Sequence, residues 1–171
     1  MRVAFGNLAR HTAAIRDQLD AAAAGVLDSG QFLFGSELQS FENAFARWCG
    51  AGHAVGVANG TDAITIALQA VGVERGDEVI TVANSCIPTA VGIENAGAIP
   101  VLVDAEPETR TIDVSQVEAA ITPRTRAILP VHLYGQCADL VSLGELARDR
   151  GLALVEDCAQ AHGAELDGRR A

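Results

Sequence analysis

Two acidic residues follow a short apolar run near the end of this sequence, and they are the first candidates for chemistry. Residues 152–155 are four apolar residues in succession, which predicts a short buried strand, and Glu156 and Asp157 come directly after it. Ligands of open α/β sheets bind outside the carboxyl ends of the strands, so a carboxylate at this position is placed to face a ligand. An acid after a strand also commonly caps a helix or lies in a solvated loop. Asp157 is therefore a candidate binding residue whose role depends on what else reaches the same edge.

A second candidate is the turn of small and polar residues at 59–62, which reads Asn-Gly-Thr-Asp. It lies between an expected strand at 54–58 and an expected helix at 63–71, and the free backbone N–H groups at the start of a helix suit a phosphate. The turn lacks the Gly-Lys-Ser/Thr of a Walker loop and the Gly-x-Gly-x-x-Gly of a dinucleotide site. A plain βα turn in which Thr61 or Asp62 caps the helix is the competing interpretation.

The elements that must position these residues alternate between strands and helices. Runs of aliphatic residues predict strands, and apolar residues at helical spacing predict helices between them. This alternation is typical of an α/β fold with a mostly parallel sheet and helices on both faces. An aromatic stripe on an expected helix, Leu38, Phe41, Phe45 and Trp48, is predicted to lie in the core. The expected strands are 54–58, 78–82, 99–103, 126–131 and 152–155.

Composition narrows the classes of function. The 171 residues are 49% hydrophobic, which is ample for a core, and the formal net charge is -10. This acidity argues against non-specific binding to nucleic acid or an anionic membrane, because both need a basic face. No run approaches the ~20 apolar residues of a membrane span, so we expect a cytoplasmic protein. The four cysteines show no metal-ligand spacing, so we expect reduced thiols and no metal site.

Five motifs, read together and in order, resemble the DegT/StrS-type sugar aminotransferases. These are pyridoxal phosphate (PLP) enzymes of the aspartate-aminotransferase-like class, known as fold type I. The resemblance extends from about Gly30 to the end of the sequence and implies the incomplete large domain of such an enzyme. The motifs are Asn-Gly-Thr-Asp-Ala at 59–63, Gly-Asp-Glu-Val-Ile at 76–80, Gly-Ala-Ile-Pro-Val at 97–101 with Asp104, Val-His-Leu-Tyr-Gly-Gln at 131–136, and Glu-Asp-Cys-Ala-Gln-Ala-His-Gly at 156–163.

The resemblance implies a role for each of the two candidate regions. Gly60 and Thr61, with Asp62, would hold the phosphate of PLP. Asp157 would pair with the pyridine nitrogen, because a carboxylate there favours the protonated ring, which withdraws electrons from the substrate carbon.

The resemblance also implies roles for other residues of these motifs, for which the physical argument is weaker. Gln160 would approach the ring hydroxyl. Cys86 falls where the family often has an aromatic residue stacked on the ring, so either stacking is weaker here or the register differs. His132, Tyr134 and His162 lie close enough in the motifs to line a pocket, but we expect each of them to be structural.

The family's Schiff-base lysine lies in a Ser-x-x-x-x-Lys-like segment that this sequence does not contain, and the sequence has no lysine at all. Transamination needs that amine as anchor and proton shuttle, so we expect this chain alone to be inactive and assign no catalytic residue within it. The polar run at 163–171 predicts no helix or strand that would complete the fold. We therefore expect an N-terminal portion, with an N-terminal helix and connector at 1–35, a partial PLP-binding large domain at 36–171, and no C-terminal small domain.

The intact enzyme implied by the resemblance would move an amino group from an amino acid such as glutamate to a nucleotide-linked keto-sugar. It would be a homodimer, with the apolar segment at 32–34 as a candidate contact. Three alternatives remain open: a dehydratase of deoxysugars that uses the pyridoxamine form of the cofactor (PMP), a non-catalytic cofactor-binding module, and, more weakly, a Rossmann dehydrogenase, whose glycine fingerprint is missing.

Overall fold

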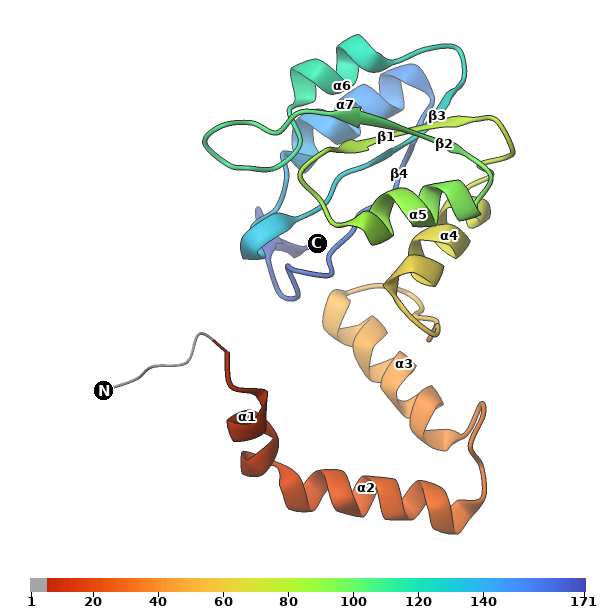
Figure 1. Ribbon diagram of the computed structural model, residues 1–171, viewed down its shortest axis with the longest axis vertical. Helices are drawn as coiled ribbons and strands as arrows, with labels where there is room; N and C mark the ends of the chain where they lie inside the picture. The colour runs from red at the N-terminus through yellow and green to blue at the C-terminus, as the bar shows by residue number, and fades with distance from the viewer. Residues whose placement is uncertain (1–5) are drawn as a thin grey trace. The chain divides into compact units, whose positions relative to one another are not determined.

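The computed structural model describes residues 6–171, and the chain divides into two compact units (Figure 1). The first unit ends at Gly56 and the second is Val57–Ala171. The predicted division after residue 35 falls inside the first unit and stays a prediction. No helix among the described residues combines the length and the apolar character needed to cross a membrane.

Three helices form the described part of the first unit: α1 (Leu8–Ala14), α2 (Arg16–Ser29) and α3 (Ser36–Cys49). Glycines in the left-handed region end the two longer helices, Gly30 after α2 with φ 66° and Gly50 after α3 with φ 72°. Only glycine adopts this conformation without a steric cost, which makes it the common helix terminator.

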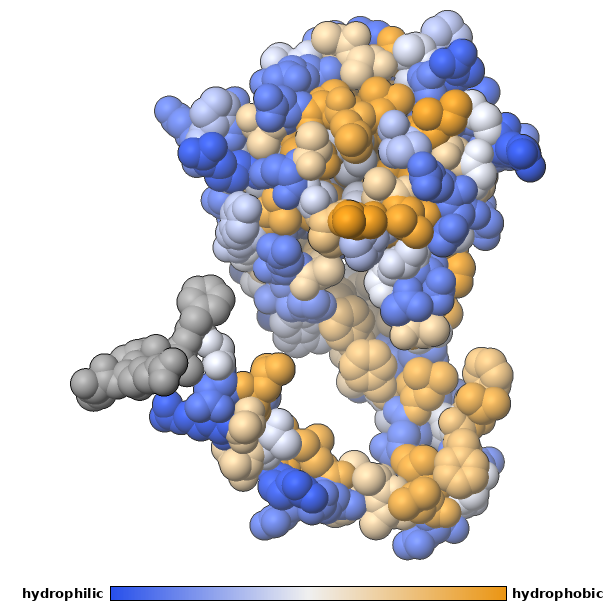
Figure 2. All heavy atoms as spheres, in the orientation of Figure 1, coloured by the Kyte–Doolittle hydropathy of each residue, from blue (hydrophilic) through white to orange (hydrophobic). Residues whose placement is uncertain are grey.

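The prediction that the aromatic stripe of α3 lies in the core is wrong for two of its members. Phe41 and Trp48 are 59% and 40% exposed. Their rings stack instead on Phe45, which lies between them, at centroid distances of 5.6 and 5.8 Å. Exposed apolar side chains gather on this unit along α2, α3 and their connector (orange in Figure 2). Periodicity identified the apolar face of the helix but carries no information on what covers it.

A four-stranded parallel sheet forms the centre of the second unit and confirms the predicted fold class. Its strands are β1 (Glu78–Val82), β2 (Ile99–Val103), β3 (Thr125–Leu129) and β4 (Ala153–Leu154), in the order β2-β1-β3-β4. Parallel strands need crossover connections, and helices supply them here, as the alternating sequence pattern predicts.

Helices cover both faces of this sheet (Figure 1). α4 (Gly60–Ala70) and α5 (Ile87–Asn95) pack on one face, and α6 (Val114–Ala120) and α7 (Leu140–Arg150) pack on the other. Each face has its own core because successive strand residues point to opposite sides of the sheet.

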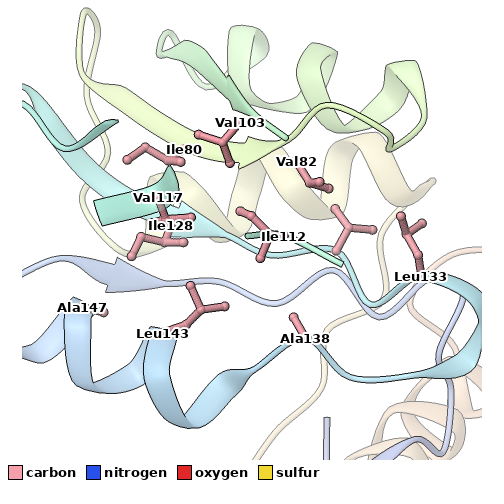
Figure 3. Packing of buried hydrophobic residues seen from close by; sticks show 11 residues of the cluster. Ile80, Val82, Val103, Ile112, Val117, Ile128, Leu133, Ala138, Leu143 and Ala147 are labelled. Atoms are coloured by element: carbon pink, nitrogen blue, oxygen red, sulfur yellow. The ribbon is translucent and has the colours of Figure 1, made fainter. Parts of the chain in front are cut away.

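Neighbouring residues of the central strands show this alternation. Val79 packs with the α4 and α5 side chains, whereas Ile80 packs with Val117 of α6 and Leu143 of α7. Figure 3 shows side chains of the α6 and α7 core pointing toward one another from the strands and helices. The sheet is therefore a rigid platform whose strand ends hold their side chains in place.

The strand predicted at 54–58 is not formed. These residues have no strand pairing, and Val55 is 78% exposed. The N–H of Gly56 donates to Oε1 of Glu42 at 2.7 Å, so a side chain takes the bond that a neighbouring strand would supply. An extended apolar run becomes a strand only when a partner strand lies beside it.

The two edges of the sheet differ in their hydrogen-bonding groups. On the outer strand β2, Ile99 donates its N–H to the carbonyl of Asp77 at 2.8 Å, toward β1. The alternation of the ladder therefore turns the nitrogen of Pro100 outward, where proline has no N–H to offer. β4, at the opposite edge, carries no proline.

The end of the sequence does form a small closing element, contrary to expectation. β5 (Glu165–Leu166) and β6 (Arg169–Arg170) pair as an antiparallel hairpin. Asp167 and Gly168 turn between them with positive φ of 51° and 74°, as a two-residue hairpin turn requires.

Candidate cofactor site at the carboxyl edge of the sheet

The N-terminus of α4 is capped by Asn59, and not by Thr61 or Asp62 as in the competing interpretation of this turn. The Asn59 side-chain oxygen accepts the N–H of Asp62 at 2.9 Å, and its amide donates to the Asp62 carboxylate at 2.9 Å. The helix therefore starts at Gly60, one turn earlier than the apolar pattern indicated. Asn59 satisfies the N–H of Asp62 and leaves those of Gly60 and Thr61 open at the positive end of the helix.

The three residues predicted to hold a phosphate differ in whether their backbone N–H is free to bind it. Gly60 and Thr61 offer open backbone donors, and no heavy atom outside its chain neighbours lies within 4 Å of the position that a Gly60 Cβ would take. Asp62 uses its N–H and its carboxylate in the cap. It therefore contributes to the shape of the turn and has no backbone donor to spare.

Asp157 lies where β4 runs on to the carboxyl edge and is fixed through its backbone. Its N–H donates to the carbonyl of Pro130 at 3.0 Å, and its carbonyl accepts the N–H of His132 at 2.9 Å. Oδ1 of the side chain accepts the N–H of Ala159 at 3.0 Å. The carboxylate is thus held on the sheet, as its position after an apolar run predicted.

The second carboxylate oxygen of Asp157 faces the first turn of α5. The hydroxyl of Thr89 lies 3.5 Å from Asp157 Oδ2 and 2.8 Å from the hydroxyl of Ser85. Thr89 is buried, with 1% of its surface exposed. Sequence reasoning missed it, although its place three residues after Cys86 put both on one side of the expected helix.

α5 is also linked to the turn at 59–62, so it joins the two candidate regions. Thr65 donates its hydroxyl to the carbonyls of both Thr61 and Gly92 at 3.0 Å. Gly92 and Thr89 are three residues apart on α5, a rise of about 4.5 Å. Asp157 and the turn at 59–62 are therefore both linked to α5, Asp157 at Thr89 and the turn at Gly92 through Thr65.

Cys86 takes the N-cap position of α5, three residues before Thr89, and is exposed. Its sulfur lies 4.0 Å from the Thr89 hydroxyl. Gln160 is exposed on the segment after Asp157, and its side-chain oxygen accepts the N–H of Tyr134 at 3.4 Å. This bond leaves the amide N–H groups of Gln160 available to a ligand.

The segment that Gln160 contacts is strained. Tyr134 has φ 59° and ψ 25°, a left-handed conformation that a tyrosine rarely adopts, and its side chain is 69% exposed. Gly135 follows with φ 81°. Strained backbone of this kind concentrates at binding sites, where the surrounding structure holds it in place.

His132, Glu156 and Cys158 offer ligand atoms within 4.8 Å of one another. Nδ1 of His132 accepts the N–H of Ala138 at 3.0 Å, so the proton of the neutral ring lies on Nε2, which donates to Glu156 at 3.0 Å. A metal on Nε2 would move this proton to Nδ1, against the Ala138 N–H. The cluster is therefore a hydrogen-bonded pair with a thiol beside it.

Burial and the nearby Glu156 carboxylate raise the pKa of the Cys137 thiol, because both disfavour the thiolate. Cys137 is therefore an unreactive thiol near neutral pH. It lies on the α7 side of this edge and contributes no charge to the region around Asp157.

The donor set fits a ring that bears a phosphate group. Asp157 offers a fixed carboxylate to a protonated ring nitrogen, and the start of α4 offers free N–H groups to an anion. Cys86 and Gln160 lie on the elements between and beside these groups. This arrangement can orient a small aromatic cofactor that is positively charged at one end and negatively charged at the other.

Comparison with known proteins gives a consistent result. The sequence profile of the DegT/DnrJ/EryC1/StrS aminotransferase family matches residues 13–171. The dTDP-3-amino-3,4,6-trideoxy-alpha-D-glucose transaminase of Micromonospora megalomicea subsp. nigra is 55% identical over 155 residues, which are 91% of this chain and 41% of that protein. This chain thus spans less than half the length of the relative.

Solved structures agree in fold. DesV of S. venezuelae superposes with a TM-score of 0.97 at 49% identity, over 99% of this chain and 46% of that one. The E. coli GDP-4-keto-6-deoxy-D-mannose-3-dehydratase with bound hydrated PLP superposes with a TM-score of 0.81 at 29% identity, over 88% of this chain and 40% of that one.

Proposed function

Because this chain belongs to the DegT/DnrJ/EryC1/StrS aminotransferase family, we propose that it forms the cofactor-binding portion of a PLP-dependent enzyme that aminates nucleotide-linked keto-sugars. The amino donor is an amino acid such as glutamate. The observation that supports this proposal is that α5 links Asp157, through Thr89, with the turn that carries the open N–H groups of Gly60 and Thr61, through Gly92 and Thr65.

Each residue of this site has a defined task toward the cofactor. Gly60 and Thr61 bind the phosphate through backbone N–H groups, and Asp157 holds the proton on the ring nitrogen. Gln160 would donate to the ring hydroxyl, and Cys86 would contact the ring. When bound, PLP supplies an electron-withdrawing ring that stabilises charge at the substrate carbon.

The sequence contains no lysine, so no side chain of this chain can carry the covalent link to PLP. We propose that the chain by itself binds the cofactor reversibly and does not transfer amino groups. The catalytic amine belongs to a part of the enzyme outside these residues.

Absorbance titration of the 171-residue chain with PLP and with PMP tests this proposal. We expect micromolar binding that Asp157→Ala weakens at least about tenfold, since bonds to charged groups are worth about 1.5–3 kcal/mol. Asp149→Ala removes a carboxylate from the exposed surface of α7 and is the matched control. Absence of binding by both cofactor forms, or binding that does not change in Asp157→Ala, contradicts the proposal.

The PMP-dependent dehydratase is the second candidate, because a dehydratase with bound PLP shares the fold. The relatives favour the aminotransferase, at 55% identity against 29%. A non-catalytic module would bind the cofactor in the same titration. Adding back the catalytic amine that this chain lacks distinguishes a non-catalytic module from an aminotransferase. In the presence of glutamate, a complemented aminotransferase converts bound PLP to PMP, and a non-catalytic module does not.

The assembly that we propose is a homodimer in the cytoplasm, with no nucleic acid or membrane as partner. The net charge of -10 supports the last point, since both partners are anionic. Phe32, Leu33 and Phe34 are exposed and are the candidate subunit contact. Sedimentation of the chain and of Phe34→Ser tests this: the variant should shift toward monomer.

A further inference from the structure

His132 is a buried residue that contacts three segments of the carboxyl edge. None of its surface is exposed. Its backbone N–H donates to the carbonyl of Asp157 at 2.9 Å, Nδ1 accepts the N–H of Ala138 at 3.0 Å, and Nε2 lies 3.0 Å from the Glu156 carboxylate. The end of β3, the start of the α7 segment and the end of β4 therefore meet at one side chain.

The two ring bonds differ in what they hold. Ala138 is buried, with 1% of its surface exposed, so its N–H depends on the His132 ring for a partner. The Glu156 side chain is 35% exposed and can reach water if the ring no longer donates to it. Loss of the first bond therefore costs folding stability, whereas loss of the second mainly frees Glu156 to move.

Glu156 and Asp157 leave the strand on opposite faces. Leu154 and Glu156 border a groove along α7, while Val155 packs with the α4 and α5 core and Asp157 faces Thr89 of α5. Alternation along a strand means that rotation of the backbone at Glu156 also rotates Asp157. A side chain that fixes Glu156 on the α7 face thus sets the direction of Asp157 on the other.

We propose that His132 is a positioning residue for the cofactor: as the Nε2–H tautomer it holds Glu156 and thereby aims the Asp157 carboxylate at the ring nitrogen. This inference rests on the proposed cofactor site. It goes beyond that site because neither His132 nor Glu156 is among the residues proposed to bind the cofactor.

Two substitutions separate the two ring bonds. His132→Gln places an amide N–H where Nε2–H lies and keeps the bond to Glu156, but it leaves the Ala138 N–H without its acceptor. His132→Asn places an oxygen where Nδ1 lies and keeps the Ala138 bond, but it releases Glu156. Both variants replace the buried imidazole ring with an open side chain, so each serves as the other's control for lost packing.

The proposal predicts that stability and cofactor binding rank these variants in opposite orders. His132→Gln should unfold at the lower urea concentration and yet bind PMP within about twofold of the unchanged chain. His132→Asn should unfold at the higher urea concentration and bind PMP about tenfold more weakly, the loss typical when a partner behind a binding group is removed. A purely structural histidine would give the same order in both measurements.

A second readout needs no cofactor. The Ala159 N–H donates to Asp157 Oδ1 at 3.0 Å, so its amide resonance reports the position of the carboxylate. This resonance should shift in His132→Asn and stay in place in His132→Gln. If both variants shift it equally, or if PMP affinity follows stability, the positioning role is wrong. If the unchanged chain binds neither PMP nor PLP, the proposed function fails, and the Ala159 resonance alone decides the role of His132.

Discussion

The two ends of the sheet in Val57–Ala171 both hold polar side chains, but they use them differently. At the amino end, Glu78 is buried and bonds to the Thr122 hydroxyl and the Arg124 guanidinium. At the carboxyl end, Asp157 is half-buried and its carboxylate oxygens can accept further bonds besides those from Ala159 and Thr89, and the N–H groups of Gly60 and Thr61 are open. Polar groups that serve folding satisfy one another, whereas those that serve binding are held in position by their backbones and left open.

The largest effect that would test this comparison comes from filling the contact between α4 and α5. A Cβ on Gly92 would lie 2.8 Å from Ile64 and 3.2 Å from the Thr61 carbonyl. Gly92→Val should therefore cost about 3 kcal/mol of unfolding free energy, at the upper end of overpacking, and should weaken PLP binding by displacing the phosphate turn. Urea denaturation and titration measure both. Gly144→Val, on α7 with open space around it, is the control.

The next effect separates binding from stability at the carboxyl end. Asp157→Asn keeps the size of the side chain but removes its charge, so PLP affinity should fall by about 2 kcal/mol, roughly thirtyfold. The unfolding midpoint should move little, because the asparagine oxygen can still accept the Ala159 N–H that Asp157 Oδ1 accepts. A large drop in the midpoint would place Asp157 with the residues of the amino end.

A smaller effect is expected at the cap of α4. Asn59→Ala removes the acceptor of the Asp62 N–H and should cost about 1 kcal/mol. The frayed turn should also bind phosphate less well, so inorganic phosphate should compete with PLP less effectively than in the unchanged chain. Asn59→Ser keeps an uncharged capping acceptor and should restore most of the stability.

The smallest effect is a pH dependence at the amino end. Hydrogen bonds from Thr122 and Arg124 lower the pKa of Glu78 in the folded state. The resulting stabilisation is complete above the ordinary pKa of a glutamate and is lost as the pH falls through that value toward the lower folded one. Denaturation midpoints of Glu78→Gln should therefore fall less between neutral pH and pH of about 3 than those of the unchanged chain. Asp113 and Asp139, whose pKa values are also lowered by capping bonds, remain in both proteins and cancel.

Four of the five expected strands and the alternation of helices were predictable from the sequence, because buried strands and amphipathic helices have local signatures. The strand at 54–58 was predicted wrongly, since strand formation there depends on a partner that local pattern does not encode. The exposure of Phe41 and Trp48 has the same origin. Both errors concern what lies beside an element, which no spacing rule reports.

The candidate site was predictable where a residue follows a strand or starts a helix. Asp157 and Gly60 were selected in this way. Asp157 follows β4, but Gly60 follows no strand, and the turn at 59–62 is placed instead by its contact with α5 through Thr65. Thr89 and the His132–Glu156 pair were missed or read as ordinary, because their importance arises from contacts between segments distant in sequence. Only coordinates reveal such contacts.

Pro100 has a consequence for how copies of this sheet can meet. With its outward position unable to donate a hydrogen bond, β2 is a poor template for another strand, which leaves β4 as the side where the ladder can be extended. Copies of the sheet that join through one extendable edge form only a pair, whereas a filament needs two extendable edges on each copy. The missing N–H therefore disfavours open-ended stacking of this sheet through β2.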